Sequence, residues 1–407
     1  MTRNGIPISD FEALQTAALD RSPVKGLTHN YYRYPARFSP LFAAAAIERF
    51  SSPGDIVLDP YMGGGTTVVE AFIAGRKAIG NDLNELSAFI VNAKTTLLTV
   101  GEKRRIREWL RDAMKEMHFR NPRSRVEHLF DQSKTQNLSL PSARPIKKAL
   151  AQGLLASESI NSAAARSFAR CALLRLGQWA LDGRKTTPNL SEFRAKLPEI
   201  AGEMLTGMGQ LAKRLGSLKR SYQPIVLAGD ASKLHESKQF RSEQEKADLV
   251  VTSPPYAGVH MLYHRWQING RREAPAPYWL TACDDGHGAA YYNFADRRAG
   301  AIAKYFDVSL GTLQSLRRVV KRRAIVVQMS DARITVKETL DNSCGSPRLM
   351  SGHISFQRSA SSTGCTPMTS KSGMFPRITF EFGCFFSAIR KGTDAVNASP
   401  VGFDSTT

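Results

Sequence analysis

The segment Asp59-Pro-Tyr-Met-Gly-Gly-Gly-Thr-Thr67 combines residue types that suit ligand binding. Three consecutive glycines allow positive φ angles and a close approach between the backbone and a ligand. No lysine follows the glycines, as a phosphate-binding loop requires, and Val68 stands where a dinucleotide fingerprint has glycine or alanine. The carboxylate of Asp59 instead suits a cationic group, such as the amino group of a methionine moiety.

A second acid, Asp82, lies at about the distance along the chain at which a carboxylate accepts hydrogen bonds from ribose hydroxyls. This position fits any adenosine cofactor. Thr66 and Thr67 are expected to cap the helix that follows the glycines. In the alternative interpretation, the glycines form a purely structural turn and Asp59 and Asp82 only cap helices.

The second chemical element is Thr252-Ser-Pro-Pro-Tyr256. Two prolines fix two φ angles and cannot continue a ladder, so they present their neighbours rigidly at the edge of a sheet. The Ser253 hydroxyl and the Pro254 carbonyl are suited to accept the two hydrogens of an exocyclic amine on a base. Tyr256 is suited to stack on a base that has been flipped out of a duplex. Alternatively, the prolines merely end a strand and the tyrosine packs in the core.

Both elements require strands that end at one sheet edge. Hydrophobic patterning predicts a βαβ unit made of strand 56–58, helix 67–74 and strand 78–80. It predicts further strands over 225–228, 248–251 and 324–328, and helices over 41–50 and 301–320. In such an open sheet, ligands bind at the carboxyl ends of the strands.

The region from Glu102 to about Ser221 is rich in Arg and Lys, and we expect it to be a mostly helical insertion, with helices over 163–181 and 190–215. Residues 343–374 contain Ser, Thr, Gly or Pro at 18 of 32 positions, which predicts poor order. Only Ile378 to Phe386 alternate as a last strand would. The expected organisation has four parts: 1–100 (N-terminal, cofactor-binding half of the core), 101–222 (basic helical insertion, possible target recognition), 223–335 (C-terminal half of the core with the catalytic motif) and 336–407 (tail).

The chain has 407 residues and a formal net charge of +20, from 56 Lys and Arg against 36 Asp and Glu. This excess favours a polyanionic partner, nucleic acid first, although a basic surface that only confers solubility is the alternative. No apolar run approaches the roughly 20 residues that span a bilayer, and residues 1–20 lack a secretory pattern. We therefore expect a cytoplasmic protein without membrane contact. Five scattered cysteines and the eight histidines indicate no disulfide framework and no metal site.

Taken together, the two elements resemble the DNA amino-methyltransferases, which use S-adenosylmethionine to methylate N4 of cytosine or N6 of adenine. The glycine turn is similar to the family's Asp-Pro-Phe-x-Gly-Ser-Gly-Thr-Thr loop, with Tyr61 and Gly64 as mild changes. The resemblance covers about 40 to 45% of the chain, near residues 28–97 and 224–330, with five elements in one workable order. It implies an α/β fold, a Rossmann-like methyltransferase sheet with helices on both faces, plus the helical insertion.

The resemblance also implies residue roles. The catalytic residues would be Ser253, Pro254, Pro255 and Tyr256. The segment from Tyr34 to Phe38 would cover the methionine end of the cofactor, and Asp230 would contact its adenine. The full set implied to bind S-adenosylmethionine is Tyr34, Pro35, Phe38, Asp59, Pro60, Tyr61, Gly63, Gly65, Thr66, Thr67, Asp82, Leu83, Asp230 and Ala231.

Serine before the two prolines is typical of cytosine-N4 enzymes, whereas Asp or Asn is typical of adenine-N6 enzymes, so the resemblance favours cytosine. The implied partners are double-stranded DNA with a flipped base and a cognate restriction endonuclease, with an orphan enzyme equally compatible. An RNA amine and a binding module without turnover are the competing hypotheses. A carbon-5 cytosine enzyme is disfavoured, because no cysteine follows a proline.

Target recognition is expected from the insertion and from residues 257–300. The basic residues predicted to contact phosphates are Lys103, Arg104, Arg105, Arg107, Arg120, Arg123, Arg125, Arg317, Arg318, Lys321, Arg322 and Arg323. Those predicted to contact the neighbours of the flipped base are His260, Tyr263, Arg265 and Trp266. Lys321-Arg-Arg323 replaces the family's usual Gly-Gly turn, and one hypothesis is that an altered reading frame replaced the end of the chain after about residue 340.

Overall fold

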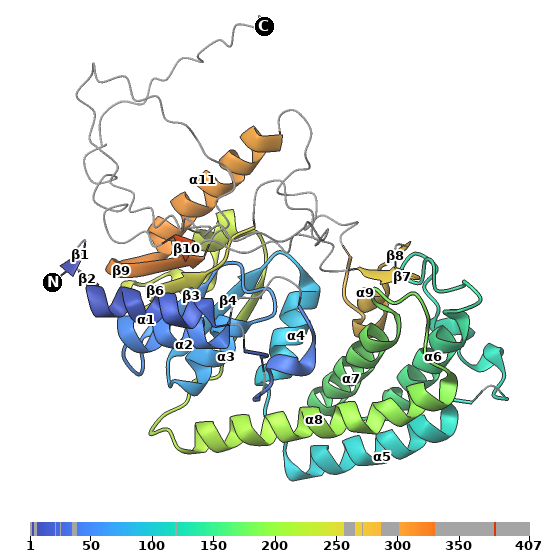
Figure 1. Ribbon diagram of the computed structural model, residues 1–407. Helices are drawn as coiled ribbons and strands as arrows, with labels where there is room; N and C mark the ends of the chain where they lie inside the picture. The colour runs from blue at the N-terminus through green and yellow to red at the C-terminus, as the bar shows by residue number, and fades with distance from the viewer. Residues whose placement is uncertain are drawn as a thin grey trace, which may run out of the picture.

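The computed structural model describes residues 2–3, 6–20, 22–24, 26–34, 39–118, 120–255, 265–270, 272–285, 301–329 and 378–379 (Figure 1). The predictions on Pro35, Phe38, Tyr256, His260, Tyr263 and most of the Ser-rich tail lie outside these ranges.

A parallel sheet organises the larger part of the molecule. Its five parallel strands are β3 (Ile56–Asp59), β4 (Lys77–Asp82), β5 (Ile225–Ala228), β6 (Ala247–Thr252) and β9 (Val320–Met329). The order across the sheet is β10-β9-β6-β3-β4-β5, in which the two-residue β10 (Ile378–Thr379) pairs antiparallel with β9. The central strands β3 and β6 are short, apolar and mostly buried, as expected of a parallel sheet covered on both faces.

The chain changes direction across this sheet between β3 and β6. It runs outward from β3 to β4 and β5, and then returns to the other side of β3 to add β6 and β9. Loops that follow β3 and β6 therefore leave in opposite directions, and this arrangement opens a crevice at their carboxyl ends. The topology alone predicts that a ligand binds there.

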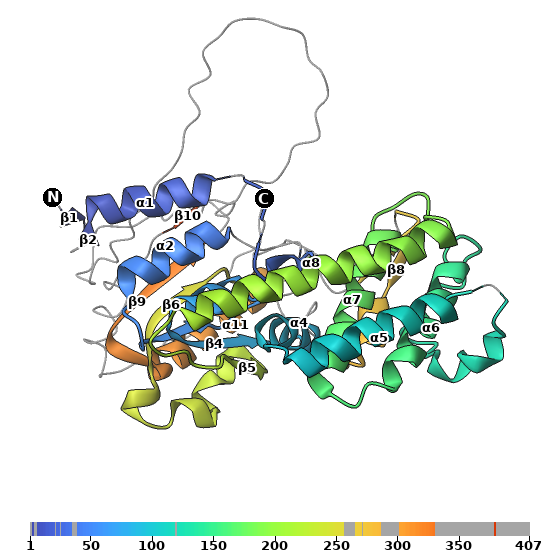
Figure 2. The ribbon, with the colours of Figure 1, turned by 90° about the horizontal axis from the view of Figure 1, so that it is seen from below.

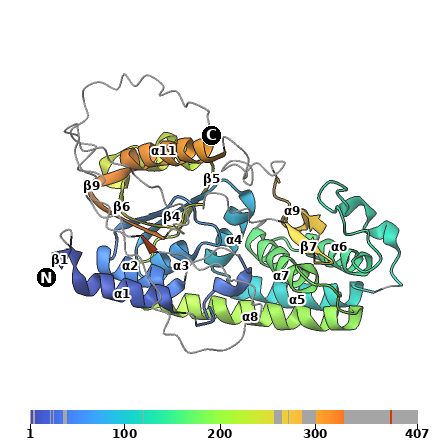
Figure 3. The same ribbon diagram turned by 45° about the horizontal axis from the view of Figure 1, so that its top comes forward.

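Helices cover both faces of the sheet, in three layers that Figure 3 shows edge-on. On one face, α1 (Ile8–Leu19), α2 (Pro40–Phe50) and α3 (Thr66–Ile73) bury a cluster that includes Leu14 and Phe42. On the other face, α11 (Ala301–Val319) and the 3-10 helix η4 (Ala231–Glu236) bury Leu316 and Leu234 against the sheet. The predicted α/β fold with helices on both faces is confirmed.

A helical region extends beside the sheet. It contains α5 (Val100–Glu116), α6 (Arg144–Glu158), α7 (Ala163–Leu181) and α8 (Leu190–Gly216), and α4 (Glu85–Thr95) joins it to the sheet. Figure 2 shows the long α8 running from the sheet layer to the far end of this region. Trp109, Phe168 and Phe193 are among the side chains fully buried in its core. The predicted helices over 163–181 and 190–215 are confirmed to within one residue.

A second segment of the chain completes this helical core. The hairpin of β7 (Trp266–Ile268) and β8 (Arg272–Ala274), followed by α9 (Ala276–Thr281), packs into the same apolar cluster as α6 and α7. Asn137 donates a hydrogen bond to the Glu273 carbonyl at 2.7 Å. The helical region is therefore built from two stretches that lie on either side of the catalytic motif in the sequence.

Several elements differ from the sequence predictions, among them β7, β8 and α9, for which no strand or helix was predicted. The helices α1 and α4 were not predicted, because α1 fully buries only Leu14 and both have weak helical periodicity. Lys321-Arg-Arg323 does not form a turn, since it lies within β9, which begins at Val320. There Lys321 Nζ lies 2.7 Å from Asp248 Oδ1, and the three basic residues fall at an irregularity in the pairing with β6, between the pairs Ala247–Val320 and Leu249–Ile325. None of the helices in the described ranges is long and apolar enough to cross a membrane.

Candidate active site at the carboxyl edge of the sheet

The structure gathers the sequence-predicted residues at one edge. Asp59 ends β3 and Asp82 ends β4, while Asp230 and Ser253 follow β5 and β6 by one or two residues. Because β5, β4, β3 and β6 are adjacent and parallel, these four chain positions lie side by side. The described parts of the predicted cofactor and catalytic segments therefore meet at the crevice between β3 and β6.

The glycine turn adopts the positive φ angles that its residue types predict. Gly63 has φ +46° and Gly65 has φ +75°, in the left-handed region. A Cβ on Gly65 would lie 2.4 Å from Val91 Cγ2, and one on Gly64 would lie 2.9 Å from Tyr34 Cβ. These glycines are therefore required for packing of the turn against the protein itself, besides any approach to a ligand.

The predicted capping of α3 by threonine is wrong. Gly65 occupies the N-cap position, and no side chain caps the helix. Thr66 and Thr67 are both buried, and the Thr67 hydroxyl donates to the Val251 carbonyl in β6 at 3.1 Å. After the left-handed N-cap both threonines are buried, and Thr67 bonds α3 to β6 instead of closing a helix end.

Asp59 lies beneath the glycine turn with 1% of its surface exposed. Its Oδ1 accepts hydrogen bonds from the Tyr61 backbone N–H at 3.1 Å and from the Thr252 hydroxyl at 2.8 Å. Burial raises the pKa of Asp59 to about 7, and the hydrogen bonds from Thr252, Thr67 and Tyr61 oppose that rise. The carboxyl group thus joins the glycine turn to the catalytic strand, and its predicted contact with a cofactor amino group stays a prediction.

Asp82 is half-buried and ties the end of β4 to the same turn. The Gly63 backbone N–H donates to Asp82 Oδ2 at 2.9 Å, and the Asn84 N–H donates to Oδ1 at 2.9 Å. Burial raises the pKa of Asp82 to about 6, against the effect of these hydrogen bonds. Each carboxylate oxygen has a second lone pair, so the group retains capacity for ligand hydroxyls.

Asn81 was missed by sequence reasoning. Its side-chain amide donates to the Pro60 carbonyl at 3.2 Å and to the Gly229 carbonyl at 2.9 Å. It is 2% exposed and connects the loops after β3 and β5 across the end of β4. Its place just before Asp82 was visible in the sequence, but only the sheet order reveals that it lies between two loops.

The wall beside the glycine turn comes from Tyr34 and α4. Tyr34 is 5% exposed, and its hydroxyl lies 3.0 Å from Ser87 Oγ. The buried Lys94 donates from Nζ to the Gly64 carbonyl at 2.5 Å. The structure therefore places Tyr34 against the turn, together with Ser87 and Lys94, which sequence reasoning did not identify.

The predicted catalytic motif continues directly from β6. Ser253, Pro254 and Pro255 are half-buried, so they are partly exposed just beyond the carboxyl end of β6 and not enclosed in the core. Tyr305 of α11 donates a hydrogen bond to the Pro255 carbonyl at 3.2 Å. Tyr61 donates to Thr312 of α11 at 2.8 Å, so this one helix contacts both chemical elements.

The remaining predicted cofactor residues lie on adjacent loops. Asp230 is half-buried and caps η4 by accepting from the Ser232 N–H at 2.9 Å. Ala231 is buried, whereas Leu83 is 37% exposed at the end of β4. The alternative that Asp59 and Asp82 only cap helices does not describe these loops, since the residue that caps α4 is Asn84 and the one that caps η4 is Asp230. Pro60 is buried behind the turn.

The prediction that Trp266 contacts the neighbours of a flipped base is wrong. Trp266 is 1% exposed, its indole N–H donates to the Tyr32 hydroxyl at 3.2 Å, and its ring fills the space beside Gly177. Arg265 forms an ion pair with Asp285 at 2.8 Å. The buried Trp266 ring packs the β7–β8 segment into the core of the helical region, and the Arg265–Asp285 pair joins the chain just before β7 to the chain after α9.

The predicted phosphate contacts of the insertion remain predictions. Arg104, Arg123 and Arg125 form ion pairs with glutamates of the same region, at 3.8, 3.7 and 2.9 Å. Lys103 is half-buried, and the others on α5 are exposed. Within the part of the chain that the structure describes, no three His, Cys, Asp or Glu side chains are arranged to hold a metal ion.

Comparison with known proteins identifies relatives of this arrangement. Residues 15–91 match the N6/N4 methyltransferase family model, described as DNA methylase. The Type II methyltransferase M.MvaI of Kocuria varians is 27% identical over 256 residues, which are 57% of this chain and 54% of that protein. The orphan methyltransferase M.BamHII of Bacillus amyloliquefaciens is 36% identical over 73 residues, 18% of this chain and 28% of that protein. The chain thus spans about half the length of the first of these relatives and about a quarter of the length of the second.

Among solved structures, the rRNA methyltransferase aviRa of Streptomyces viridochromogenes aligns with 78% of this chain and 85% of its own. The sequence identity is 11% and the TM-score is 0.32. A score this low carries no argument about fold or substrate.

Proposed function

Since the chain belongs to the N4-cytosine and N6-adenine amino-methyltransferase family, we propose that it transfers a methyl group from S-adenosylmethionine to an exocyclic amino group in DNA. One observation carries the proposal. The glycine turn and Asp82 on one side, and Ser253-Pro-Pro255 on the other, flank the same crevice between β3 and β6. A cofactor site beside an amine site is what direct methyl transfer requires.

The residues present suit this cofactor. Asp82 offers carboxylate oxygens to ribose hydroxyls, and Asp230 lies on the neighbouring loop where the resemblance expects adenine. Tyr34 borders the turn, and the proposed cofactor set further includes Pro35 and Phe38. When bound, S-adenosylmethionine supplies an electrophilic methyl group. The acidic character of the edge matches the positive charges of the sulfonium and amino groups.

The chain's own groups would position the amine. An exocyclic amine is a poor nucleophile because its lone pair is delocalised into the ring. The Ser253 hydroxyl and the Pro254 carbonyl would accept its two hydrogens, aim its lone pair and stabilise the charge that develops during transfer. Tyr256 would stack on the flipped base. Tyr305 supports this role indirectly, because its hydrogen bond fixes the neighbouring Pro255 carbonyl.

Cytosine N4 is the proposed target, because serine precedes the two prolines. Adenine N6 is the second candidate, and an exocyclic amine in RNA is the third. A restriction-modification system is the proposed context, in the cytoplasm and with a cognate endonuclease. The relatives named Type II methyltransferase favour that context, and the relative named orphan favours a solitary enzyme.

The test is identification of the product. Purified full-length chain is incubated with S-adenosylmethionine and unmethylated genomic DNA, and the digested nucleosides are analysed by mass spectrometry. We expect N4-methylcytosine, and a Ser253→Ala preparation of equal cofactor affinity serves as the control. N6-methyladenine would change only the base. A chain that binds the cofactor but produces no methylated deoxynucleoside would contradict the proposed function.

A further inference from the structure

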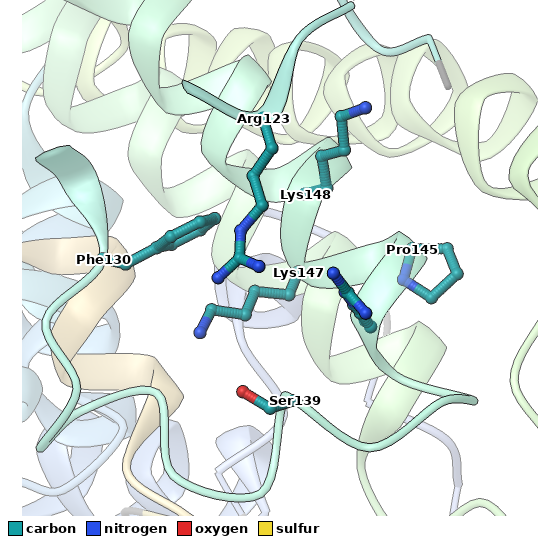
Figure 4. Close-up of a pocket in the computed structure, with 7 residues that line it drawn as sticks. Arg123, Phe130, Ser139, Pro145, Lys147 and Lys148 are labelled. Carbon is teal, nitrogen blue, oxygen red and sulfur yellow. The ribbon is translucent and has the colours of Figure 1, made fainter. Parts of the chain in front are cut away.

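A pocket of about 490 Å³ lies in the helical region, away from the sheet edge. Seven residues line it: Arg123, Phe130, Ser139, Arg144, Pro145, Lys147 and Lys148. Figure 4 shows that Arg123 and Lys147 extend from different elements toward the space beside the Phe130 ring, with Ser139 across from them. Four of the seven are cationic, and none of these described lining residues is acidic.

Lys147 is the most constrained of the four cations. It is 7% exposed, its Nζ donates to the Thr135 hydroxyl at 3.0 Å, and it lies 4.3 Å from the centre of the Phe130 ring. Burial, and then the nearby charge of Arg123, lower the pKa of this ammonium. A buried cation held by a hydroxyl and an aromatic face remains costly, because neither group neutralises its charge.

The other cations reinforce that positive potential. The Arg123 guanidinium lies 5.7 Å from the same ring, and its carboxylate partner Glu127 is exposed and 3.7 Å away. Arg144 begins α6, and Lys148 follows Lys147 on it. The positive end of the α6 dipole is located at the same place. Four cations line one pocket, and such a lining suits a ligand group with two or more acceptor oxygens and negative charge.

The pocket is connected to the proposed cofactor site through α9. The Phe130 ring lies 6.2 Å from the Trp279 ring, and the Trp279 indole donates to the Leu129 carbonyl at 2.6 Å. The adjacent Tyr278 donates to Asn84 Oδ1 at 3.2 Å, and Asn84 is two residues beyond Asp82. A single short helix therefore separates the basic pocket from the acidic sheet edge.

We propose that this pocket binds a backbone phosphate of the DNA that flanks the target base. The inference rests on the proposed function for its partner, but it adds a site that the sequence analysis did not identify. Of its four cations only Arg123 was expected at a phosphate. The pocket would read no sequence, and it would fix the register of the duplex relative to the catalytic motif.

The test compares two doubly substituted full-length chains with the same change in charge. Arg144→Gln with Lys148→Gln alters the pocket at the start of α6. Lys213→Gln with Arg214→Gln alters two exposed cations in the last turn of α8, outside the pocket. Binding of a fluorescein-labelled duplex of mixed sequence is followed by anisotropy between about 50 and 200 mM salt. Thermal melting and S-adenosylmethionine titration show whether each variant is folded.

We expect the pocket variant to bind the duplex about tenfold more weakly at the lowest salt. Its plot of log affinity against log salt should be less steep by about 0.9, because one phosphate is no longer neutralised. The α8 variant should follow the parent. Equal slopes in all three chains, with methylated DNA still produced, would overturn the proposal that the pocket binds a phosphate and would leave the proposed function intact. A parent that binds the cofactor but no duplex would overturn both.

Discussion

The sheet edge and the helical region place charge in opposite ways. At the edge, Asp59 and Asp82 are buried or half-buried, and each is held by backbone N–H groups and neighbouring side chains. In the helical region the core is apolar, and most charges lie outside, as Arg104 does with 75% of its side chain exposed. The difference suggests a division of labour, in which a rigid acidic edge suits a cationic cofactor and a basic surface suits DNA.

The largest expected effect is on the chemical step alone. Ser253→Ala removes one proposed acceptor of the amine and should lower kcat by about 10²-fold, as loss of one preorganised hydrogen-bonding group does in other enzymes. The Kd for S-adenosylmethionine should change less than about twofold. Single-turnover methyl transfer and cofactor titration measure the two quantities. An unchanged kcat would show that Ser253 does not act in methyl transfer, and the sheet edge would then lose its proposed amine site.

Substitution of one glycine in each region compares how tightly the two regions are packed. Gly65 in the turn and Gly183 after α7 have nearly equal φ angles, +75° and +69°, but a Cβ would meet Val91 at 2.4 Å only at Gly65. Gly183→Ala should cost about 1 to 2 kcal/mol for its backbone conformation. Gly65→Ala should cost about 1 to 3 kcal/mol more for overpacking. Urea unfolding measures both, and equal destabilisation of the two variants would contradict the packing role of the turn.

A smaller effect is expected from pH. Burial raises the pKa of Asp82 to about 6 and that of Asp59 to about 7, so both carboxyl groups are partly protonated in the cofactor-free chain near those values. A cationic cofactor favours the ionised forms, and its affinity should rise between about pH 5 and pH 8 and then level off. The same raised pKa values should lower the free energy of unfolding as pH rises from about 4 to about 7. A cofactor affinity that falls over this range would contradict the assignment.

The smallest effect is expected on the surface of the helical region. Arg104→Ala breaks an exposed pair with Glu108 at 3.8 Å, and it should change the free energy of unfolding by less than about 0.5 kcal/mol. Chemical denaturation of this variant beside the parent provides the measurement. A decrease of more than about 1 kcal/mol in the free energy of unfolding would show that the surface charges of α5 stabilise the fold.

The sheet edge was largely predictable from the sequence, because each of its residues lies within a few positions of a strand end. Period and turn chemistry located 59–67, 82 and 253–255, and the structure brings them to one edge. The partners of these residues were not predictable. Asn81 binds a carbonyl that is 148 positions away in the sequence, and Thr252 binds a carboxylate that is 193 positions away. Such contacts depend on sheet order, which local patterns do not specify.

The helical region was predicted as helices but not as a core. Nothing local in Trp266 or Tyr278 indicates that they pack against a segment more than 80 residues earlier, so an aromatic residue near the motif was assigned to the substrate. The basic pocket was missed for the same reason. Lys147 and Phe130 are 17 positions apart, and only the fold of the loop between α5 and α6 brings them together.

The most direct test of the central claim is a calorimetric titration of S-adenosylmethionine into the parent chain and into Asp82→Asn. This substitution keeps the size of the side chain and removes its negative charge. The parent should bind one equivalent, and Asp82→Asn should bind at least about tenfold more weakly, because hydrogen bonds to a charged group contribute about 1.5 to 3 kcal/mol. Equal affinities, with both chains folded, would mean that the cofactor does not bind at the carboxyl ends of β3 and β4.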